Sequence, residues 1–412
     1  MFKHIIFKIA TVWLVLTQTL PPFNLLFPFG DAIKFAAYAG VTLLLFPSLL
    51  RKRSIIALFI YALVLLSYYE IGNKFFEDIF SAIIEPFVIL SGLIIAEYTL
   101  KYDKEYKFTK LMVITVFASN IVMSIVTIPL LELHPNLIRM TTAGEAEEGY
   151  SNIFSYIIQY QTVHGLPFLF APLVFLCKRT YKVDKKLFIL WTLCGLMLFY
   201  IIFRSNAATS FLVSAMMIIV GFIFNVEKFT KKGFSQLVLI GLLGVFFIQP
   251  SVIEPIISTV QSTMNPYGAG YKRMEEVKES IVYGSSDGDL ESRQNLYSNS
   301  FDLFLQSPLW GTSSPEKIGR HTWILDRLAL LGLLFVVPIA LVFVYNFRGF
   351  YKELIHTKVI YTWGFMGLIL MLILKNSFNQ GTWLYGFAYL PLFCRYIDNI
   401  IDKKSIIKSR LV

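Results

Sequence analysis

The stretch Glu291–Leu334 reads ESRQNLYSNSFDLFLQSPLWGTSSPEKIGRHTWILDRLALLGLL. A basic residue, Arg293, opens it, a Pro-Leu-Trp-Gly turn at 308–311 divides it, and His321 precedes the hydrophobic helix at its end. The chain on either side is largely apolar, so we interpret this stretch as a long polar loop that returns to a membrane surface. Such a loop suits chemistry on a lipid-linked anion, because Arg pairs with phosphate oxygens and His exchanges protons near neutral pH.

The composition of the chain is that of a membrane protein. Of its 412 residues, 56% are hydrophobic and 16% are charged, whereas soluble domains carry about 25% charged residues. Apolar runs of about 20 residues, the length that crosses a bilayer core, recur along the chain. The sequence therefore predicts an all-α fold, a polytopic membrane helical bundle that forms a single transmembrane domain over residues 1–412.

About twelve transmembrane helices are expected, with eleven as the alternative because the first and last are weakest. The N-terminal run has no small-residue cleavage site and is interrupted by Lys8, so it is interpreted as an uncleaved first helix. The expected spans are 5–20, 31–50, 54–69, 79–99, 111–131, 153–177, 187–203, 206–225, 236–257, 322–345, 359–375 and 382–396.

The basic residues set the expected orientation. With the N-terminus inside, 25 of the 37 Lys and Arg residues fall in cytoplasmic segments, including Arg395 in the C-terminal tail. The positive-inside rule then places both termini in the cytoplasm. The net charge of +10 thus reflects short loops between spans and does not indicate nucleic-acid binding. Two external loops are long, 132–152 and 258–321, and the second should contain helices at 272–282 and up to Gln306.

Three residues are candidates for catalysis: Arg204, Arg293 and His321. Arg204 follows the seventh span directly and faces outward, against the positive-inside trend. A lone Arg at a helix end is often only an interfacial anchor, but charges near the membrane interior tend to mark function. Arg293 and His321 bracket the folded part of the long loop. Taken singly, each would more often be a surface residue.

Other polar groups lie at membrane depth and are weaker candidates. Glu85, in the fourth span, needs a partner because an ionisable group there is costly. His164 lies in the sixth span with two glutamines, and polar groups in helices often only join neighbours by hydrogen bonds. Asp326 and Arg327 are adjacent in the tenth span and are expected to pair in part with other helices.

Familiar catalytic and metal motifs are absent from the sequence. There is no Gly-rich phosphate loop, HExxH, CxxC or GxSxG pattern, and the five histidines do not cluster at metal-ligand spacing. The three cysteines imply no disulfide framework. No metal site and no cofactor are therefore expected.

Over residues 185–345 the chain resembles the family of O-antigen ligases and O-antigen or capsular polysaccharide polymerases. FRSNAAT contains Arg204, and RQNLYSNSFDLFLQSPLWG is similar to the family's Arg, amphipathic helix and Pro-x-x-Gly. HTWILDRLALLGLL is similar to the family's His followed eleven residues later by a Gly, here Gly332. Thr322 stands where the family often has Asn.

The resemblance implies a membrane-embedded glycosyltransferase that needs no metal and uses an undecaprenyl-diphosphate-linked oligosaccharide as donor. It implies that Arg204 and Arg293 bind the diphosphate and that His321 activates the acceptor hydroxyl or orients the diphosphate. Glu85 and His164 are added as substrate-binding candidates. The expected location is the cytoplasmic (inner) membrane of a bacterium. The expected partners are the lipid-linked oligosaccharide, membrane lipid and other polysaccharide-assembly proteins, but no nucleic acid.

The leading hypothesis is a bacterial polysaccharide polymerase that joins lipid-linked repeat units of O-antigen, capsule or exopolysaccharide at the outer face of the membrane. A ligase that transfers the glycan to another acceptor is the alternative within the family, and only the acceptor separates the two. A flippase or other transporter is the alternative of a different class. Transporters often show inverted repeats and broken helices, and the sequence indicates neither. A membrane sensor that binds sugar is a further alternative.

Overall fold

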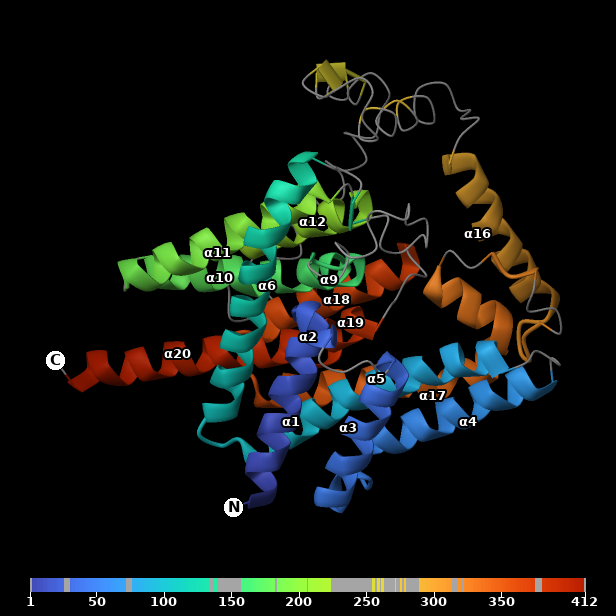
Figure 1. Cartoon of the computed structure of the whole chain (residues 1–412), viewed down its shortest axis with the longest axis horizontal. Helices are drawn as coiled ribbons and strands as arrows, with labels where there is room; N and C mark the ends of the chain where they lie inside the picture. Colours follow the sequence, from blue (N-terminus) through green and yellow to red (C-terminus); the bar gives the residue numbers. More distant parts are fainter. Residues whose placement is uncertain are drawn as a thin grey trace.

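The computed structural model describes residues 2–25, 30–71, 76–133, 137–138, 157–181, 184–205, 207–223, 289–312, 317–319, 322–374 and 380–410, with single positions and pairs between 254 and 278. Every regular element in this part of the chain is a helix (Figure 1). The predicted all-α class is therefore confirmed for the described residues.

The helices vary from short connecting turns to spans of membrane length. Two 3-10 helices, η1 (Pro47–Leu49) and η2 (Leu166–Leu169), and a π-helical turn, η5 (Tyr385–Tyr389), lie between them. The α-helices are α1 (Phe2–Thr19), α2 (Pro22–Leu25), α3 (Asp31–Leu45), α4 (Arg53–Ile71), α5 (Phe76–Tyr102), α6 (Lys107–Leu133), α9 (Tyr160–Gly165), α10 (Phe170–Tyr181), α11 (Lys185–Arg204), α12 (Ala208–Ile223), α16 (Asp289–Gln306), α17 (Trp323–Glu353), α18 (Lys358–Leu374), α19 (Gln380–Leu384) and α20 (Leu390–Arg410).

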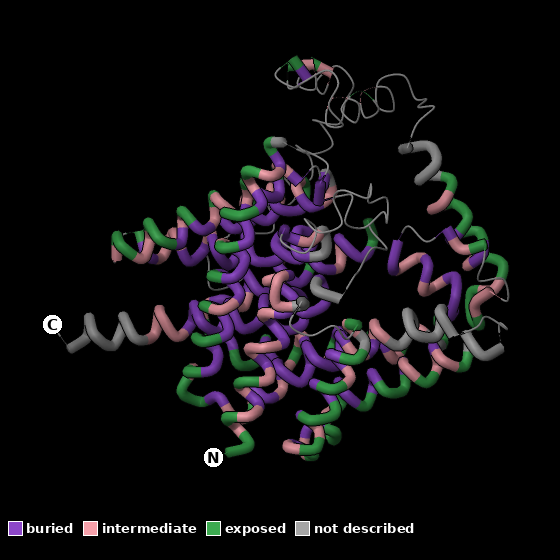
Figure 2. The backbone as a smooth tube through the Cα atoms, viewed as in Figure 1, coloured by how far each residue is buried: buried purple, intermediate pink, exposed green. Residues whose placement is uncertain are grey.

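The C-terminal helices form the centre of the bundle. Helices α3, α4, α5 and α17 pack together on one side and α10, α11 and α12 on the other, with α18 and α19 between them (Figure 1). Every residue from Thr382 to Asp398 is buried, and the buried residues concentrate in this central region (Figure 2). A helix that is apolar on all sides, as this segment nearly is, must be enclosed by other helices or by lipid.

One charged residue in this central segment has a structural role. Arg395 is only 4% exposed, and its guanidinium donates to the carbonyls of Thr99 and Asp103, each at 2.8 Å. It therefore adds a charged donor to two carbonyls at the C-terminal end of α5, where the regular pattern of helical hydrogen bonds ends. Arg395 also lies 4.6 Å from the centre of the Tyr106 ring. Arg395 thus lies in the buried first part of α20 rather than in a tail, whereas its expected position on the cytoplasmic side stays a prediction.

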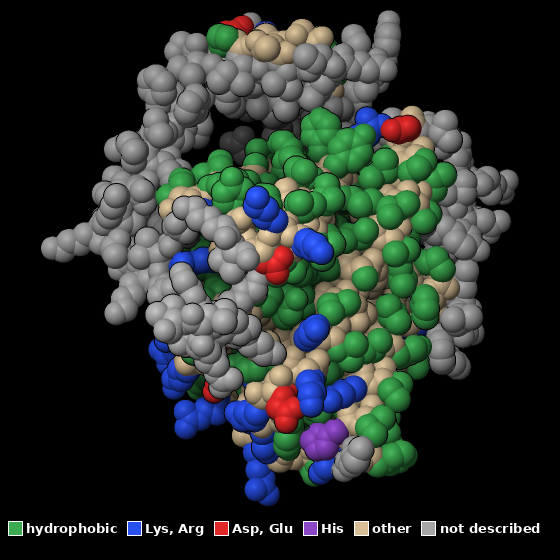
Figure 3. Space-filling view, turned by 90° about the vertical axis from the view of Figure 1, so that its left-hand side faces the viewer, with side chains coloured by type: hydrophobic (Ala, Val, Ile, Leu, Met, Phe, Trp, Pro, Cys, Tyr) green, Lys and Arg blue, Asp and Glu red, His purple; other side chains and the backbone are tan. Residues whose placement is uncertain are grey.

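The outer surface of the bundle is apolar. On α11 the side chains of Leu193, Leu196, Tyr200 and Phe203 are 61%, 62%, 40% and 51% exposed and recur every three or four residues. That spacing places them on one face of the helix. Figure 3 shows a face of the molecule that is largely covered by hydrophobic side chains, with Lys and Arg gathered toward its lower part. Contiguous exposed apolar surface of this kind is typical of contact with lipid.

Two described helical segments are long and apolar enough to cross a membrane, Lys107–Glu132 and Lys185–Arg204. The two halves of α17 are a third candidate if the bent pair is one span. The described residues therefore support an integral membrane protein but do not confirm the number of twelve spans. Shorter apolar helices cover Ile33–Leu45, Arg53–Ser67, Thr209–Ile223 and Lys358–Leu374.

Several predicted boundaries agree closely with the observed helices. Helices α11, α12 and α18 lie within two residues of their expected ends, and α16 ends at Gln306 as expected. The expected span 153–177 differs, because its described part divides at the 3-10 helix η2, which begins at Leu166 and has Pro167 in its first turn. The expected helix at 272–282 and most of the expected span 236–257 lie outside the described residues.

Helix α17 is broken, and this was not expected. Gly332 has φ 67° and ψ 177°, and the segments Trp323–Leu334 and Val336–Glu353 meet at 110°. This region of backbone space is open essentially only to glycine. The prediction that the chain contains no broken helix is therefore wrong, because the apolar pattern of the sequence continues unchanged through the break.

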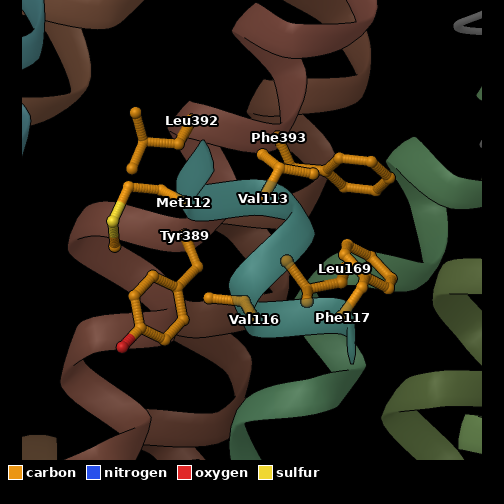
Figure 4. A pocket seen from close by; sticks show the side chains of 8 residues that line it. All are labelled: Met112, Val113, Val116, Phe117, Leu169, Tyr389, Leu392 and Phe393. Carbon is orange, nitrogen blue, oxygen red and sulfur yellow. The ribbon is translucent and has the colours of Figure 1, made fainter. Parts of the chain in front are cut away.

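A small cavity in the bundle is a packing void rather than a binding site. It has a volume of about 10 Å³ between α6, η2 and the C-terminal helices (Figure 4). A single water needs about 10–15 Å³ and polar partners, whereas most of this lining is apolar. The side chains around it are Met112, Val113, Val116, Phe117, Leu169, Tyr389, Leu392 and Phe393.

Candidate functional site

The Pro-Leu-Trp-Gly turn after α16 fills the break in α17. A helix interrupted at Gly332 leaves backbone groups without their usual partners, and buried backbone groups must be paired. The turn pairs them, so the Pro-Leu-Trp-Gly turn and the break at Gly332 form one structural unit. The bonds run from Thr312 N–H to the Ala329 carbonyl (2.7 Å), from Leu333 N–H to the Pro308 carbonyl (2.9 Å) and from Leu334 N–H to the Leu309 carbonyl (3.3 Å).

Two glycines allow this contact. Gly311 has φ 80°, and a Cβ atom there would lie 2.1 Å from the Leu330 carbonyl oxygen. A Cβ on Gly332 would lie 2.4 Å from the Leu309 carbonyl oxygen and 2.5 Å from the Gly311 nitrogen. Each glycine thus faces the backbone around the other, and backbone cannot move aside as a flexible side chain can. This close approach of the two backbone segments accounts for glycine at both positions, 311 and 332.

The segments that carry Arg293 and His321 lie side by side. The amide of Gly319, two residues before His321, donates to Ser300 Oγ at 3.0 Å. A Cβ on Gly319 would lie 2.0 Å from the carbonyl oxygen of Leu296, three residues after Arg293. In Figure 1, α16 lies against the first half of α17. The structure describes the backbone but not the side chain of Arg293, and His321 lies outside the described residues.

A second contact fixes the start of α17 on the same helix. Ser300 Oγ donates to Asp326 Oδ1 at 2.6 Å, and Asp326 Oδ2 accepts from the amide of Thr322 at 3.1 Å. Thr322 is the residue that precedes the first turn of α17. Ser300 and Asp326, both buried, therefore hold the backbone on either side of His321. Ser300 was not singled out from the sequence, since a lone serine in a polar loop gives no signal.

Arg204 ends α11, as expected from its position in the sequence. It is half-buried and makes no hydrogen bond, ion pair or ring contact with the residues that the structure describes. The hydroxyl of the next residue, Ser205, donates to the Ile202 carbonyl at 2.7 Å and helps to close the helix. No described hydrogen bond or ion pair joins α11 to α16, so these interactions do not connect Arg204 with the segments of Arg293 and His321.

Glu85 lies in α5, and three donors from two other helices hold its carboxylate. Oε1 accepts from the Tyr61 hydroxyl at 2.9 Å, and Oε2 accepts from Arg327 Nη2 at 2.6 Å and from Trp323 Nε1 at 3.3 Å. The side chains of Glu85 and Arg327 are 12% and 17% exposed. Glu85 is thus the partner of Arg327 in a largely buried ion pair. This confirms the expectation that Glu85 needs a partner and that Arg327 pairs with another helix.

His164 is buried inside the bundle. It is 1% exposed, and its Nδ1 is hydrogen-bonded to Ser210 Oγ in the first turn of α12. The neighbouring Gly165 packs closely against the ring of Tyr385, whose hydroxyl exchanges hydrogen bonds of 2.7 and 3.0 Å with the Asn120 amide. His164 therefore joins α9 to α12, the helix that follows Arg204.

Metal binding finds no support among the described residues, where no group of three or more His, Cys, Asp or Glu side chains could hold an ion. The expected use of a metal-free mechanism stays a prediction.

Comparison with known proteins finds a matching family model. Residues 193–323 match the family model Wzy_C, described as O-antigen ligase. Arg204, Arg293 and His321 all fall within the matched segment, whereas Glu85 and His164 lie outside it. No curated protein matches the chain. The resemblance noted in the sequence is confirmed by this match over residues 193–323, and the members of the matched family are membrane glycosyltransferases that transfer lipid-linked glycans.

Proposed function

We propose that the protein is a bacterial polysaccharide polymerase that joins undecaprenyl-diphosphate-linked oligosaccharide repeat units at the outer face of the cytoplasmic membrane. In this proposal the chain is one transmembrane domain of about twelve spans with both termini in the cytoplasm. Residues 258–321 form the extracytoplasmic loop. The observation that carries the proposal is the packing of the segment before His321 against the turn of α16 that follows Arg293, within the segment matched to the family.

The reaction needs a base for the acceptor and positive charge for the leaving group. The acceptor hydroxyl attacks the anomeric carbon of the donor unit, and its proton passes to His321. The bond from that carbon to the diphosphate breaks, and its electron pair leaves on undecaprenyl diphosphate. Negative charge therefore grows on the diphosphate, and a fixed guanidinium beside it stabilises the transition state more than the ground state.

Arg293 and Arg204 are the proposed diphosphate ligands. A guanidinium binds phosphate oxygens through two parallel hydrogen bonds, and two such groups would supply charge that a divalent cation supplies in other enzymes. The half-buried Arg204, free of contacts to described residues, supports this role. Binding of the donor would bring Arg204 to the side of Arg293, so that the substrate itself completes the site.

An apolar groove between α4 and α5 is the proposed place for the prenyl chain. Its volume is about 240 Å³, and it lies beside the Glu85 ion pair, because Ala62 follows Tyr61 and Pro86 follows Glu85. A prenyl chain requires an apolar surface of this kind. The side chains that line the groove are Leu58, Phe59, Ala62, Leu66, Pro86, Phe87 and Leu90.

Filling the groove should weaken binding of long-chain donors. Ala62→Phe adds a ring to its lining, and we expect the KM for an undecaprenyl donor to rise about tenfold or more, since one methylene in an apolar pocket changes binding by about 10- to 200-fold. The KM for a donor with a two-isoprene chain should change little. Steady-state kinetics with both donors measure this. Leu63→Phe, on an α4 residue that is 66% exposed, is the matched control, and equal KM values in the two variants would exclude the groove.

Reconstitution distinguishes the candidate functions. Purified protein in vesicles with lipid-linked repeat units as the sole substrate should produce elongated chains. Transfer that occurs only after a second acceptor is added would indicate a ligase. Movement of the lipid-linked unit across the bilayer without any new glycosidic bond would indicate a flippase. The broken helix α17 does not favour the flippase, because the turn from Pro308 to Gly311 occupies the break.

A further inference from the structure

The Glu85 ion pair lies at the start of the helix that follows His321. Trp323 is the first residue of α17 and Arg327 is four residues later, so both side chains lie on one face of its first turns. Their donors converge on one oxygen of Glu85, and the Arg327 guanidinium lies 5.8 Å from the centre of the Trp323 ring. The carboxylate of Glu85 in α5 therefore holds the first turn of α17, which begins two residues after His321 in the sequence.

The same turn is held on a second side. Asp326 precedes Arg327, and consecutive helical side chains project about 100° apart. Asp326 is bonded to Ser300 of α16, whereas Arg327 is bonded to Glu85 of α5. Trp323 also packs edge-on against Trp383, with ring centres 5.2 Å apart. The position and rotation of this turn are thus set by α5, α16 and α19 together.

Stability alone does not explain a charged pair at this place. Well-packed apolar residues of similar volume often stabilise a protein as much as a buried ion pair does. An ion pair differs in that it accepts few geometries, because both charges must stay paired and hydrogen-bonded. Three donors also occupy the carboxylate of Glu85, which leaves it poorly placed to bind a sugar hydroxyl.

We propose that Glu85 is a positioning residue for His321. It acts through Arg327 and Trp323, which fix the first turn of α17, and it does not contact the glycan. This inference rests on the proposed function, because it requires His321 to act in glycan transfer.

The kinetic test separates positioning from binding. Glu85→Ala should lower kcat about 100-fold, the effect of a misplacement of about 1 Å in a catalytic group, and should leave the KM for the donor within about twofold. A tenfold rise in KM with unchanged kcat would mean that Glu85 binds substrate and would overturn the proposal. Tyr61→Phe is the matched control, since it removes one of the three donors but keeps the ion pair, and it should retain most of kcat.

A double-variant cycle tests whether Glu85 acts through His321. In the proposal, Glu85→Ala combined with His321→Ala is no slower than His321→Ala alone in single-turnover transfer, because the group to be positioned is already absent. If the rate reduction in the double variant equals the product of the two single-variant reductions, Glu85 acts independently of His321. That result would overturn the proposal. If His321→Ala by itself keeps the wild-type kcat, the proposed catalytic function fails as well, so the two failures are distinguishable.

A milder variant covers the case in which Glu85→Ala does not fold. Trp323→Phe removes the indole N–H donor to Glu85 and keeps a ring against Trp383. It should lower kcat by a smaller factor than Glu85→Ala does. Combined with His321→Ala, it should not slow transfer further. Exchange of the two charges, Glu85→Arg with Arg327→Glu, should recover kcat relative to either single change. If the rate reductions caused by Trp323→Phe and His321→Ala multiply in the double variant, that result would contradict the positioning role in the same way.

Discussion

Alanine in place of His321 is expected to slow glycan transfer by about 10²- to 10⁴-fold, the usual contribution of a general base. Alanine in place of Arg293 is expected to slow it by about 10²- to 10³-fold, because one group that stabilises the developing charge is lost. Both variants should insert into the membrane at the wild-type level. The measurement is the polymer length distribution formed by each purified variant from lipid-linked repeat units.

The long loop offers a matched control for both variants. Lys317 is an exposed basic residue two positions before Gly319, and Lys317→Ala should leave the product distribution unchanged. A normal distribution in both the His321 and the Arg293 variants would remove the catalytic assignment. A loss of product in Lys317→Ala as well would show that any change of charge in the loop is harmful, so that neither residue could be given a specific role.

Replacement of Gly332 by alanine is expected to disable the protein through its fold. The backbone region that Gly332 occupies is open essentially only to glycine, and another residue held there costs about 1–3 kcal/mol. The added Cβ would also lie 2.4 Å from the Leu309 carbonyl oxygen, and overpacking of this kind costs about 1–3 kcal/mol. The expected sum is about 2–6 kcal/mol of unfolding free energy, measured as thermal unfolding of the purified protein in detergent.

The effect on activity should exceed the effect on stability. The added Cβ would separate the turn at Gly311 from the break at Gly332 and would move α16 away from α17. The backbone next to Arg293 would then lie farther from the backbone next to His321. A displacement of about 1 Å would reduce transfer about 100-fold. Gly311→Ala should behave in the same way, because its Cβ would lie 2.1 Å from the Leu330 carbonyl oxygen.

A second glycine provides the control for this pair. Gly40 lies in α3 with no atom within 4 Å of a Cβ built on it. Gly40→Ala should be neutral or should stabilise the protein by about 0.5–1 kcal/mol, the usual gain of alanine over glycine in a helix. Wild-type activity and unfolding temperature in Gly332→Ala would show that the turn does not depend on the close approach of the two backbones.

The sequence alone determined the class of the protein and the ends of many helices. Apolar runs of about 20 residues require helices in a membrane, because every backbone group must be paired within its own segment. This local requirement explains why α11, α12 and α18 begin and end within two residues of their expected limits. The motifs around Arg204, Arg293 and His321 also indicated the family whose model matches residues 193–323, since residue type and spacing along the chain were sufficient.

Only the tertiary structure decided how the motifs are held. Glu85 and Arg327 are 242 residues apart, and nothing in either helix specifies that partner, since any nearby cation would satisfy an isolated carboxylate. The break in α17 is likewise invisible in an apolar pattern that runs through Gly332 without change. Its conformation depends on the carbonyls of Pro308 and Leu309 reaching the freed amides. Local pattern therefore fixed what is helical, whereas contacts between distant segments fixed where the helices break and which charges meet.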